Sequence, residues 1–144
     1  MRARFADDQG FTLVELLVVM LILGLLAAIA LPLFFNQRTK AQDAEARSAV
    51  RTAQTAIETY ATDHDGSYEG AEADDLRAIE ETLVDAAISD VTSDENSYSI
   101  TVESSAGDPL HTFTIARKSD GRTEYSCTEH GEGGCPITGR WADA

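Results

Sequence analysis

The stretch GFTLVELLVVMLILGLLAAIALP, from Gly10 to Pro32, is an apolar run that contains a single acidic residue, Glu15. Residues 16–31 carry no polar side chain, and the apolar character continues to Phe35. As a helix, these roughly 25 residues would measure about 37 Å. That length is sufficient to cross a hydrocarbon core of about 30 Å. The sequence therefore predicts a membrane-length helix with a carboxylate close to its start.

The segment before this run is a polar leader of residues 1–10, in which two arginines and two aspartates cancel. A secretory signal peptide cut after Ala30 is one alternative, but the apolar region of such a peptide is usually only about 7–15 residues long. Pro32 to Phe35 also continue the apolar run beyond the small residues. A plain membrane anchor explains the length of the run, but explains neither Glu15 nor the abrupt junction after Gly10.

Charge is distributed unevenly along the chain, whose formal net charge is −14. Residues 36–51 contain four basic residues, Arg38, Lys40, Arg47 and Arg51. Residues 52–144 contain five basic and twenty acidic residues. Such a surface repels phosphate backbones, so we expect the head of the molecule not to bind nucleic acid.

A second helical pattern follows the apolar run without interruption. Residues 36–63 contain neither Gly nor Pro. Apolar side chains recur at steps of three and four, which is the spacing of one helix face; they are Ala46, Val50, Ala53, Ile57 and Tyr60. The two segments together predict one helix of about fifty residues, half of it apolar on all sides, ending near Gly66.

The remainder of the chain predicts a small antiparallel sheet. A short helix is expected over residues 72–89, where Leu76, Ile79, Leu83, Ala87 and Ile88 share a face. The period then changes to two, and three strands are expected in SYSITVE, HTFTIAR and TEYSC, with Asp120-Gly121 as a hairpin turn. A weaker fourth strand is expected in ITGRWA, residues 137–142. The predicted fold class is α+β, with the long helix packed on the sheet.

The two cysteines, Cys127 and Cys135, enclose the glycine-rich loop TEHGEGG. In an oxidising compartment outside the membrane, a disulfide is the expected state. A metal site that uses both cysteines and His130 is the alternative, although it would need further ligands. We therefore expect a C-terminal loop closed by a disulfide.

Glu15 requires a partner, because a lone carboxylate in an apolar bilayer region costs up to about 2.5–3.5 kcal/mol. Cleavage between Gly10 and Phe11 would create an ammonium group four residues before it, on the same face of a helix. At about 4 Å and an effective dielectric near 20, such a pair is worth roughly 4 kcal/mol before desolvation. The amine of a neighbouring chain could equally be the partner, and would then set the register between chains.

These features together resemble the type IV prepilins. The resemblance rests on Gly10, the following FTLVELLVV, the long apolar helix and its amphipathic extension. Glu15 stands at the family's acidic fifth mature position, and Gly24 and Pro32 match helix-disrupting residues that many members carry. The rod-end sequence AIETYATDHDGSY is also similar to small pilins. Beyond about residue 68 the likeness is architectural only.

The resemblance implies three parts, namely a leader (1–10), a transmembrane and filament-core helix (11–35) and a globular head (36–144). A prepilin peptidase would cut after Gly10, and Phe11 would be N-methylated. The subunit would reside in the cytoplasmic membrane and then join an extracellular pilus, a helical homopolymer built by membrane assembly machinery. The assembly residues implied are Phe11, Glu15, Gly24 and Pro32.

Two other functional classes compete with this interpretation. One is a pseudopilin of a type II secretion or competence system; the other is a membrane-anchored binding protein. A calcium site at Asp94, Glu95 and Asn96 would favour a secretion pseudopilin, but an acidic turn is the simpler interpretation. No arrangement typical of a catalytic, cofactor or metal site is evident, so we expect a protein that is not an enzyme.

Overall fold

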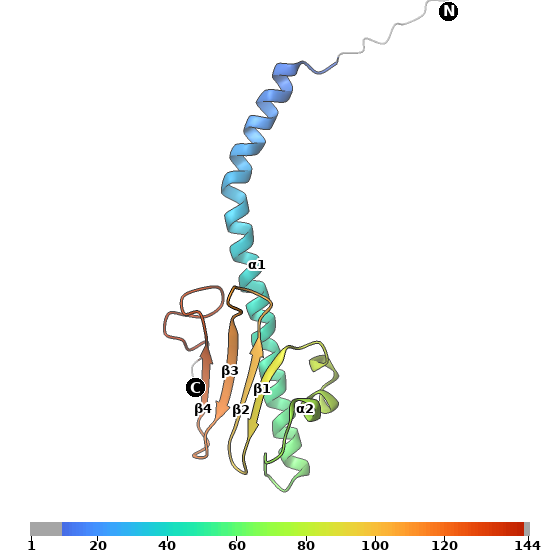
Figure 1. Ribbon diagram of the computed structural model, residues 1–144, viewed down its shortest axis with the longest axis vertical. Helices are drawn as coiled ribbons and strands as arrows, with labels where there is room; N and C mark the ends of the chain where they lie inside the picture. The colour runs from blue at the N-terminus through green and yellow to red at the C-terminus, as the bar shows by residue number, and fades with distance from the viewer. Residues whose placement is uncertain (1–9, 143–144) are drawn as a thin grey trace, which may run out of the picture. The chain divides into compact units, whose positions relative to one another are not determined.

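The structure is a computed structural model that describes residues 10–142 (Figure 1). The rest of the predicted leader, residues 1–9, lies outside the described residues. The chain divides into two compact units with the boundary between Phe35 and Asn36. Helix α1 (Leu13–Asp63) contributes to both units and is 51 residues long, which confirms the single long helix expected from the sequence.

The head contains a four-stranded antiparallel sheet in the order β1-β2-β3-β4 (Figure 1). Its strands are β1 (Ile88–Ser93), β2 (Tyr98–Glu103), β3 (Thr112–Arg117) and β4 (Thr123–Cys127). Each strand follows its neighbour in the chain, so the sheet is a simple meander. The β3–β4 turn closes at Gly121, where φ is +87°, as the Asp-Gly pair predicted.

The core of the head lies between the second half of α1 and one face of this sheet. Four members of the predicted helix stripe are buried, Ala46, Val50, Ala53 and Ile57, whereas the fifth, Tyr60, is only partly buried. Ala56, which was not predicted, is completely buried beside them. The sheet contributes the alternating residues Tyr98, Ile100 and Val102 of β2 and Phe113 and Ile115 of β3. The two apolar surfaces, each incomplete alone, form one cluster.

Glu58 of α1 forms a polar clasp at one side of this core. Its carboxylate accepts hydrogen bonds from the hydroxyl of Tyr68 (2.7 Å) and from that of Tyr98 in β2 (2.9 Å). Burial raises the pKa of the Tyr98 hydroxyl, and the hydrogen bond to the Glu58 carboxylate raises it further. The helix, the loop after it and the sheet are thereby joined through one side chain.

Helix α1 ends at Asp63, about one turn before Gly66, near which the sequence predicted its end. Asp65 and Gly66 have φ values of +55° and +88°, and the Gly66 N–H donates to the Ala61 carbonyl at 2.8 Å. A left-handed residue followed by this bond back to the last turn is a common helix termination. Gly66 adopts the conformation without the steric penalty that a side chain would carry.

Two sequence predictions about the head were wrong. The helix expected over residues 72–89 is only α2 (Ala73–Ile79), followed by a 3-10 turn, η1 (Glu81–Leu83), and Ile88 begins strand β1 instead. Pairing with β2 overrides the local helical spacing here, because it gives hydrogen-bond partners to backbone groups along the edge of β2 that a helix would leave unpaired. Residues 137–142 form turns rather than a strand, since Gly139 has φ +68° and its carbonyl accepts from the Cys127 N–H at 3.0 Å.

Candidate processing and assembly site

The junction between Gly10 and Phe11 is open to solvent. Both residues are exposed, and Phe11 is 79% exposed. A Cβ atom added at Gly10 would meet no heavy atom within 4 Å. The chain itself therefore places no steric demand for glycine at this position, so any such demand must come from a partner that binds the junction.

Glu15 lies in the first turn of α1 and forms hydrogen bonds with Thr12. The Thr12 N–H donates to Glu15 Oε2 at 3.2 Å, and the Glu15 N–H donates to Thr12 Oγ1 at 3.2 Å. This reciprocal pair is a capping box, which satisfies N–H groups that the first turn of a helix leaves without partners. In the uncut chain, Glu15 thus fixes the start of α1, which begins at Leu13.

The pairing of Glu15 with a Phe11 ammonium stays a prediction, because Phe11 is an internal residue of this chain. The structure places Phe11 just outside the helix, one residue before Thr12. Cleavage would put the new positive charge beside the N-terminus of α1, where a carboxylate is also favoured by the helix dipole. Glu15 would then face both the cap and the new charge.

The segment from Phe11 to Phe35 is apolar on every side. All of its large apolar side chains are exposed, with exposures between 47% for Val19 and 79% for Phe11. Among the described residues, α1 is the one helix with the length and apolar composition of a membrane span. A soluble protein rarely leaves so large an apolar surface uncovered. This half of α1 therefore presents an apolar surface that needs a covering.

Gly24 and Pro32 lie within this segment of α1. The helix passes through both, including Pro32, although a proline removes one backbone hydrogen bond. A Cβ at Gly24 would meet nothing within 4 Å. Both residues are exposed, and the bending or loss of helix expected between them in a filament stays a prediction.

Cys127 and Cys135 form a disulfide with a Cα–Cα distance of 5.8 Å, which confirms the expected C-terminal loop. The cysteines are therefore not thiolate ligands, and His130 does not join them in a metal site. Within residues 10–142, His, Cys, Asp and Glu side chains form no group of three or more that could hold a metal ion. Asp94 instead accepts a hydrogen bond from the Ser97 hydroxyl at 3.2 Å in the β1–β2 turn.

A buried carboxylate, Asp43, anchors this loop to α1. Asp43 Oδ2 lies 2.9 Å from His111 Nδ1 and accepts the Gly134 N–H at 2.7 Å. Asp43 and His111 are almost completely buried. A Cβ at Gly133 or at Gly134 would clash with the Asp43 side chain, so both glycines allow the loop to approach the helix closely.

The predicted site residues lie in two separate parts of the chain. Gly10, Phe11 and Glu15 lie within the first turn of α1 or just before it, whereas the cysteines lie in the head. Sequence reasoning missed Thr12, although Thr followed three residues later by Glu is a capping-box signal. It also missed Asp43, which lies three residues before Ala46 and so continues the apolar stripe, where a carboxylate indicates a buried contact.

Comparison with known proteins places these features in a family. Residues 6–31 match the model of the prokaryotic N-terminal methylation motif. A fimbrial protein of Pseudomonas aeruginosa is 30% identical over 132 residues, which cover 79% of this chain and 82% of that protein. The chain belongs to the type IV pilin family.

Two further relatives match this pilin over a smaller share of its length. The type IV major pilin protein PilA of Myxococcus xanthus is 36% identical over 58 residues, 40% of this chain and 26% of that protein. The competence protein ComGC of Halalkalibacterium halodurans is 35% identical over 65 residues, 45% of this chain and 64% of that protein. This pilin therefore spans less than two thirds of the length of both relatives.

Proposed function

We propose that this pilin is the structural subunit of an extracellular type IV pilus. The observation that carries the proposal is the contrast between a head with a complete core and a helix segment, Phe11 to Phe35, whose apolar side chains are all exposed. A bilayer can cover that segment in the unassembled subunit, and the same segments of other copies can cover it in a filament. Membrane residence followed by self-assembly therefore explains how the same apolar surface is covered first by lipid and then by other copies.

In this proposal a prepilin peptidase cuts between Gly10 and Phe11, and the Phe11 amine is methylated. The match of residues 6–31 to the methylation motif supports this processing. The positively charged amine, methylated or not, pairs with Glu15 of the same or a neighbouring copy as subunits leave the membrane. Assembly machinery in the membrane supplies the energy, and the pilin itself performs no catalysis and needs no cofactor.

N-terminal sequencing and the intact mass of the protein from its native membrane test the cut. We expect the mature chain to begin at Phe11, with 134 residues remaining of the 144. Gly10→Val should leave an uncut precursor, and the open space around Gly10 means that a folding defect would not explain that result. A mature start after Ala30 would contradict the proposal.

A pseudopilin of a competence system is the second candidate, favoured by the similarity to the competence protein ComGC. A pseudopilin would undergo the same cleavage but would build only a short fibre in the cell envelope. Electron microscopy of cells with an antibody against the head separates the two. Long labelled surface fibres support the pilus, whereas cleaved protein without surface fibres supports the pseudopilin.

A further inference from the structure

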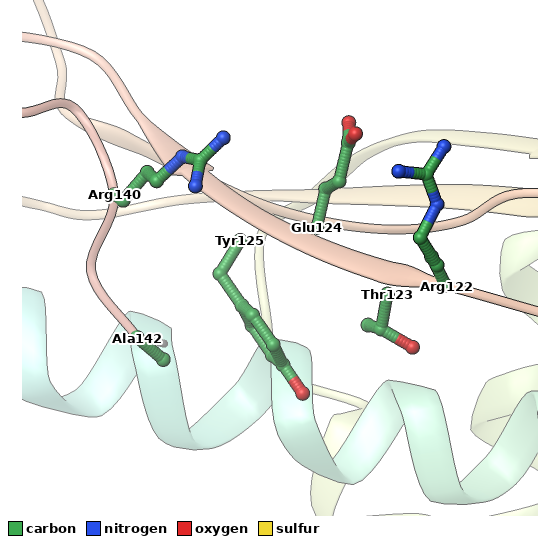
Figure 2. A pocket seen from close by; sticks show the side chains of 6 residues that line it. All are labelled: Arg122, Thr123, Glu124, Tyr125, Arg140 and Ala142. Atoms are coloured by element: carbon green, nitrogen blue, oxygen red, sulfur yellow. The ribbon is translucent and has the colours of Figure 1, made fainter. Parts of the chain in front are cut away.

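Two of the few basic side chains in the acidic head lie beside strand β4. Arg122 and Arg140 line a hollow with Thr123, Glu124, Tyr125 and Ala142 (Figure 2). Glu124 is already paired with Lys118 at 3.3 Å. Arg140 is exposed and forms no ion pair within residues 10–142. Arg122 is paired with Asp120 at 2.7 Å, and its side chain is still 77% exposed. Both guanidinium groups are therefore accessible to a partner.

Part of the backbone along the open edge of β4 also lacks partners among the described residues, namely the groups of Thr123 and Tyr125, whereas Cys127 is paired. The N–H of Cys127 points away from β3, because it donates to the Gly139 carbonyl. Backbone groups alternate in direction along an antiparallel strand, so those of Tyr125 and Thr123 point outward as well. Neither residue makes a further backbone hydrogen bond with the described residues. Such an edge is a template for another extended strand.

The opposite edge of the sheet is acidic. Strand β1 carries Asp90, and Asp94 and Glu95 lie in the turn that follows it. All three are exposed, and none forms an ion pair with another described residue. Because Asp94 N–H donates to Ser97 across the turn, the alternation leaves backbone groups of Ser93 facing outward.

The two edges are suited to pair between copies that have the same orientation. Successive strands alternate in direction, so β1 and β4 run in opposite directions and a second copy can add its β1 to β4 as an antiparallel neighbour. Since Tyr98 pairs with Arg117, the β1–β2 and β3–β4 turns lie at the same end of the sheet. Arg122 would then lie beside the acidic turn of the second copy.

The other end of the interface follows from the same register. Arg140 adjoins Gly139, whose carbonyl accepts from Cys127 at the far end of β4. A strand that runs antiparallel to β4, with Ser93 opposite Thr123, brings its Asp90 to that end. The opposite charges therefore meet at both ends of the added strand, and reversing the direction of the second copy would lose this match.

We propose that the β4 edge binds the β1 edge of a second copy of this chain by antiparallel strand addition, with Arg140 facing Asp90 and Arg122 facing the Asp94–Glu95 turn. The inference rests on the proposed function, since it assigns a partner contact within the polymer. The contact joins two different surfaces and is therefore heterologous, which allows open-ended growth rather than a closed dimer. The equal orientation of the copies keeps their head helices side by side and parallel.

Zero-length carbodiimide cross-linking of purified filaments tests the contact. Arg140→Lys places a primary amine at the edge while keeping its charge, and we expect an inter-chain link between position 140 and Asp90 in the peptide map. Arg77→Lys is the matched control, because Arg77 is paired with Asp74 of its own helix at 2.9 Å. That variant should link within one chain only. Filaments in which position 140 forms no inter-chain link to residues 90–95 would overturn the inference.

Charge reversal gives an independent test with the same filaments. Arg140→Glu should lower the yield of sheared filaments about fivefold, the size expected for one exposed ion pair of about 1 kcal/mol. Adding Asp90→Arg to the same chain should restore the yield, and a swap that fails to restore it would contradict the pairing. Wild-type cells that make no filaments would instead refute the proposed function. Normal filaments without the link would refute only this contact.

Discussion

The two halves of helix α1 show what a helix face requires. In the second half, Val50, Ala53 and Ile57 are completely buried against the sheet, and the exposed sides of that half are polar. In the first half, Leu21 and every other large apolar side chain is exposed, and no polar side exists between residues 16 and 31. The apolar face of the second half is therefore buried within one chain, whereas the first half has no such cover, and we propose that lipid or other copies supply it.

The largest effect that would sharpen this comparison is expected from Glu15→Ala. The change leaves the Phe11 ammonium of the cleaved chain unpaired in an apolar filament core, and loss of one partner of a buried pair costs about 3–5 kcal/mol. Cleavage should continue, since the lone acid is the unfavourable group in a bilayer. The measurement is the yield of sheared filaments relative to membrane-held mature subunit, and an unchanged yield would remove Glu15 from assembly.

Glu15→Gln is the matched control, because glutamine can retain the capping box with Thr12 but carries no charge. If the charge matters for assembly, this variant should lose filaments as Glu15→Ala does. Normal filaments from Glu15→Gln would show that the residue acts only as a helix cap.

A second experiment compares equal truncations in the two halves. Ile57→Ala removes a fully buried side chain and should lower the free energy of unfolding of the head by about 2–5 kcal/mol. Leu21→Ala removes an exposed one and should change it by less than about 0.5 kcal/mol. The fluorescence of Trp141, the single tryptophan and a buried part of the head, reports this unfolding in detergent. Equal losses of unfolding free energy from both variants would contradict this difference between the two halves of α1.

The disulfide should have a smaller effect, confined to the head. Replacing Cys127 and Cys135 together by serine removes a short loop closure, and we expect a loss below the roughly 3 kcal/mol typical of a 15-residue loop. Non-reducing mass spectrometry of native filaments should first find the two cysteines linked. If this loss of unfolding free energy exceeds that of Ile57→Ala, the disulfide contributes more to the stability of the head than the Ile57 side chain does.

The smallest expected effect is a pH dependence from Tyr98. Burial raises the pKa of its hydroxyl in the folded head, so the folded state retains this proton at a pH where the unfolded chain releases it. The contribution of Tyr98 to the free energy of unfolding should therefore be fully present below about pH 10, the ordinary tyrosine pKa. It should fall as the pH rises above that value. Denaturant unfolding at pH 9 and pH 11 measures this difference. It should be smaller in Tyr98→Phe, and an equal fall in both proteins would exclude Tyr98 as its source.

The sequence by itself determined the long helix, its apolar first half, strands β2 to β4 and the C-terminal disulfide. These features depend on local spacing, composition and a short covalent loop, all of which can be counted along the chain. The junction at Gly10 and the acid at Glu15 were visible for the same reason, because the change from polar to apolar residues is itself a local signal.

Only the tertiary structure decided that Ile88 begins a strand rather than extending a helix, and that Asp43 holds His111 and Gly134. In each case the deciding partner lies outside the local helical spacing: Ile88 pairs with Val102 in the next strand, and Asp43 is separated from Gly134 by 91 residues. Local propensity is a weak preference that such contacts override, since burial and hydrogen bonding act on whatever the fold brings together. What covers the first half of α1 depends on the molecules around the chain and not on its own tertiary structure.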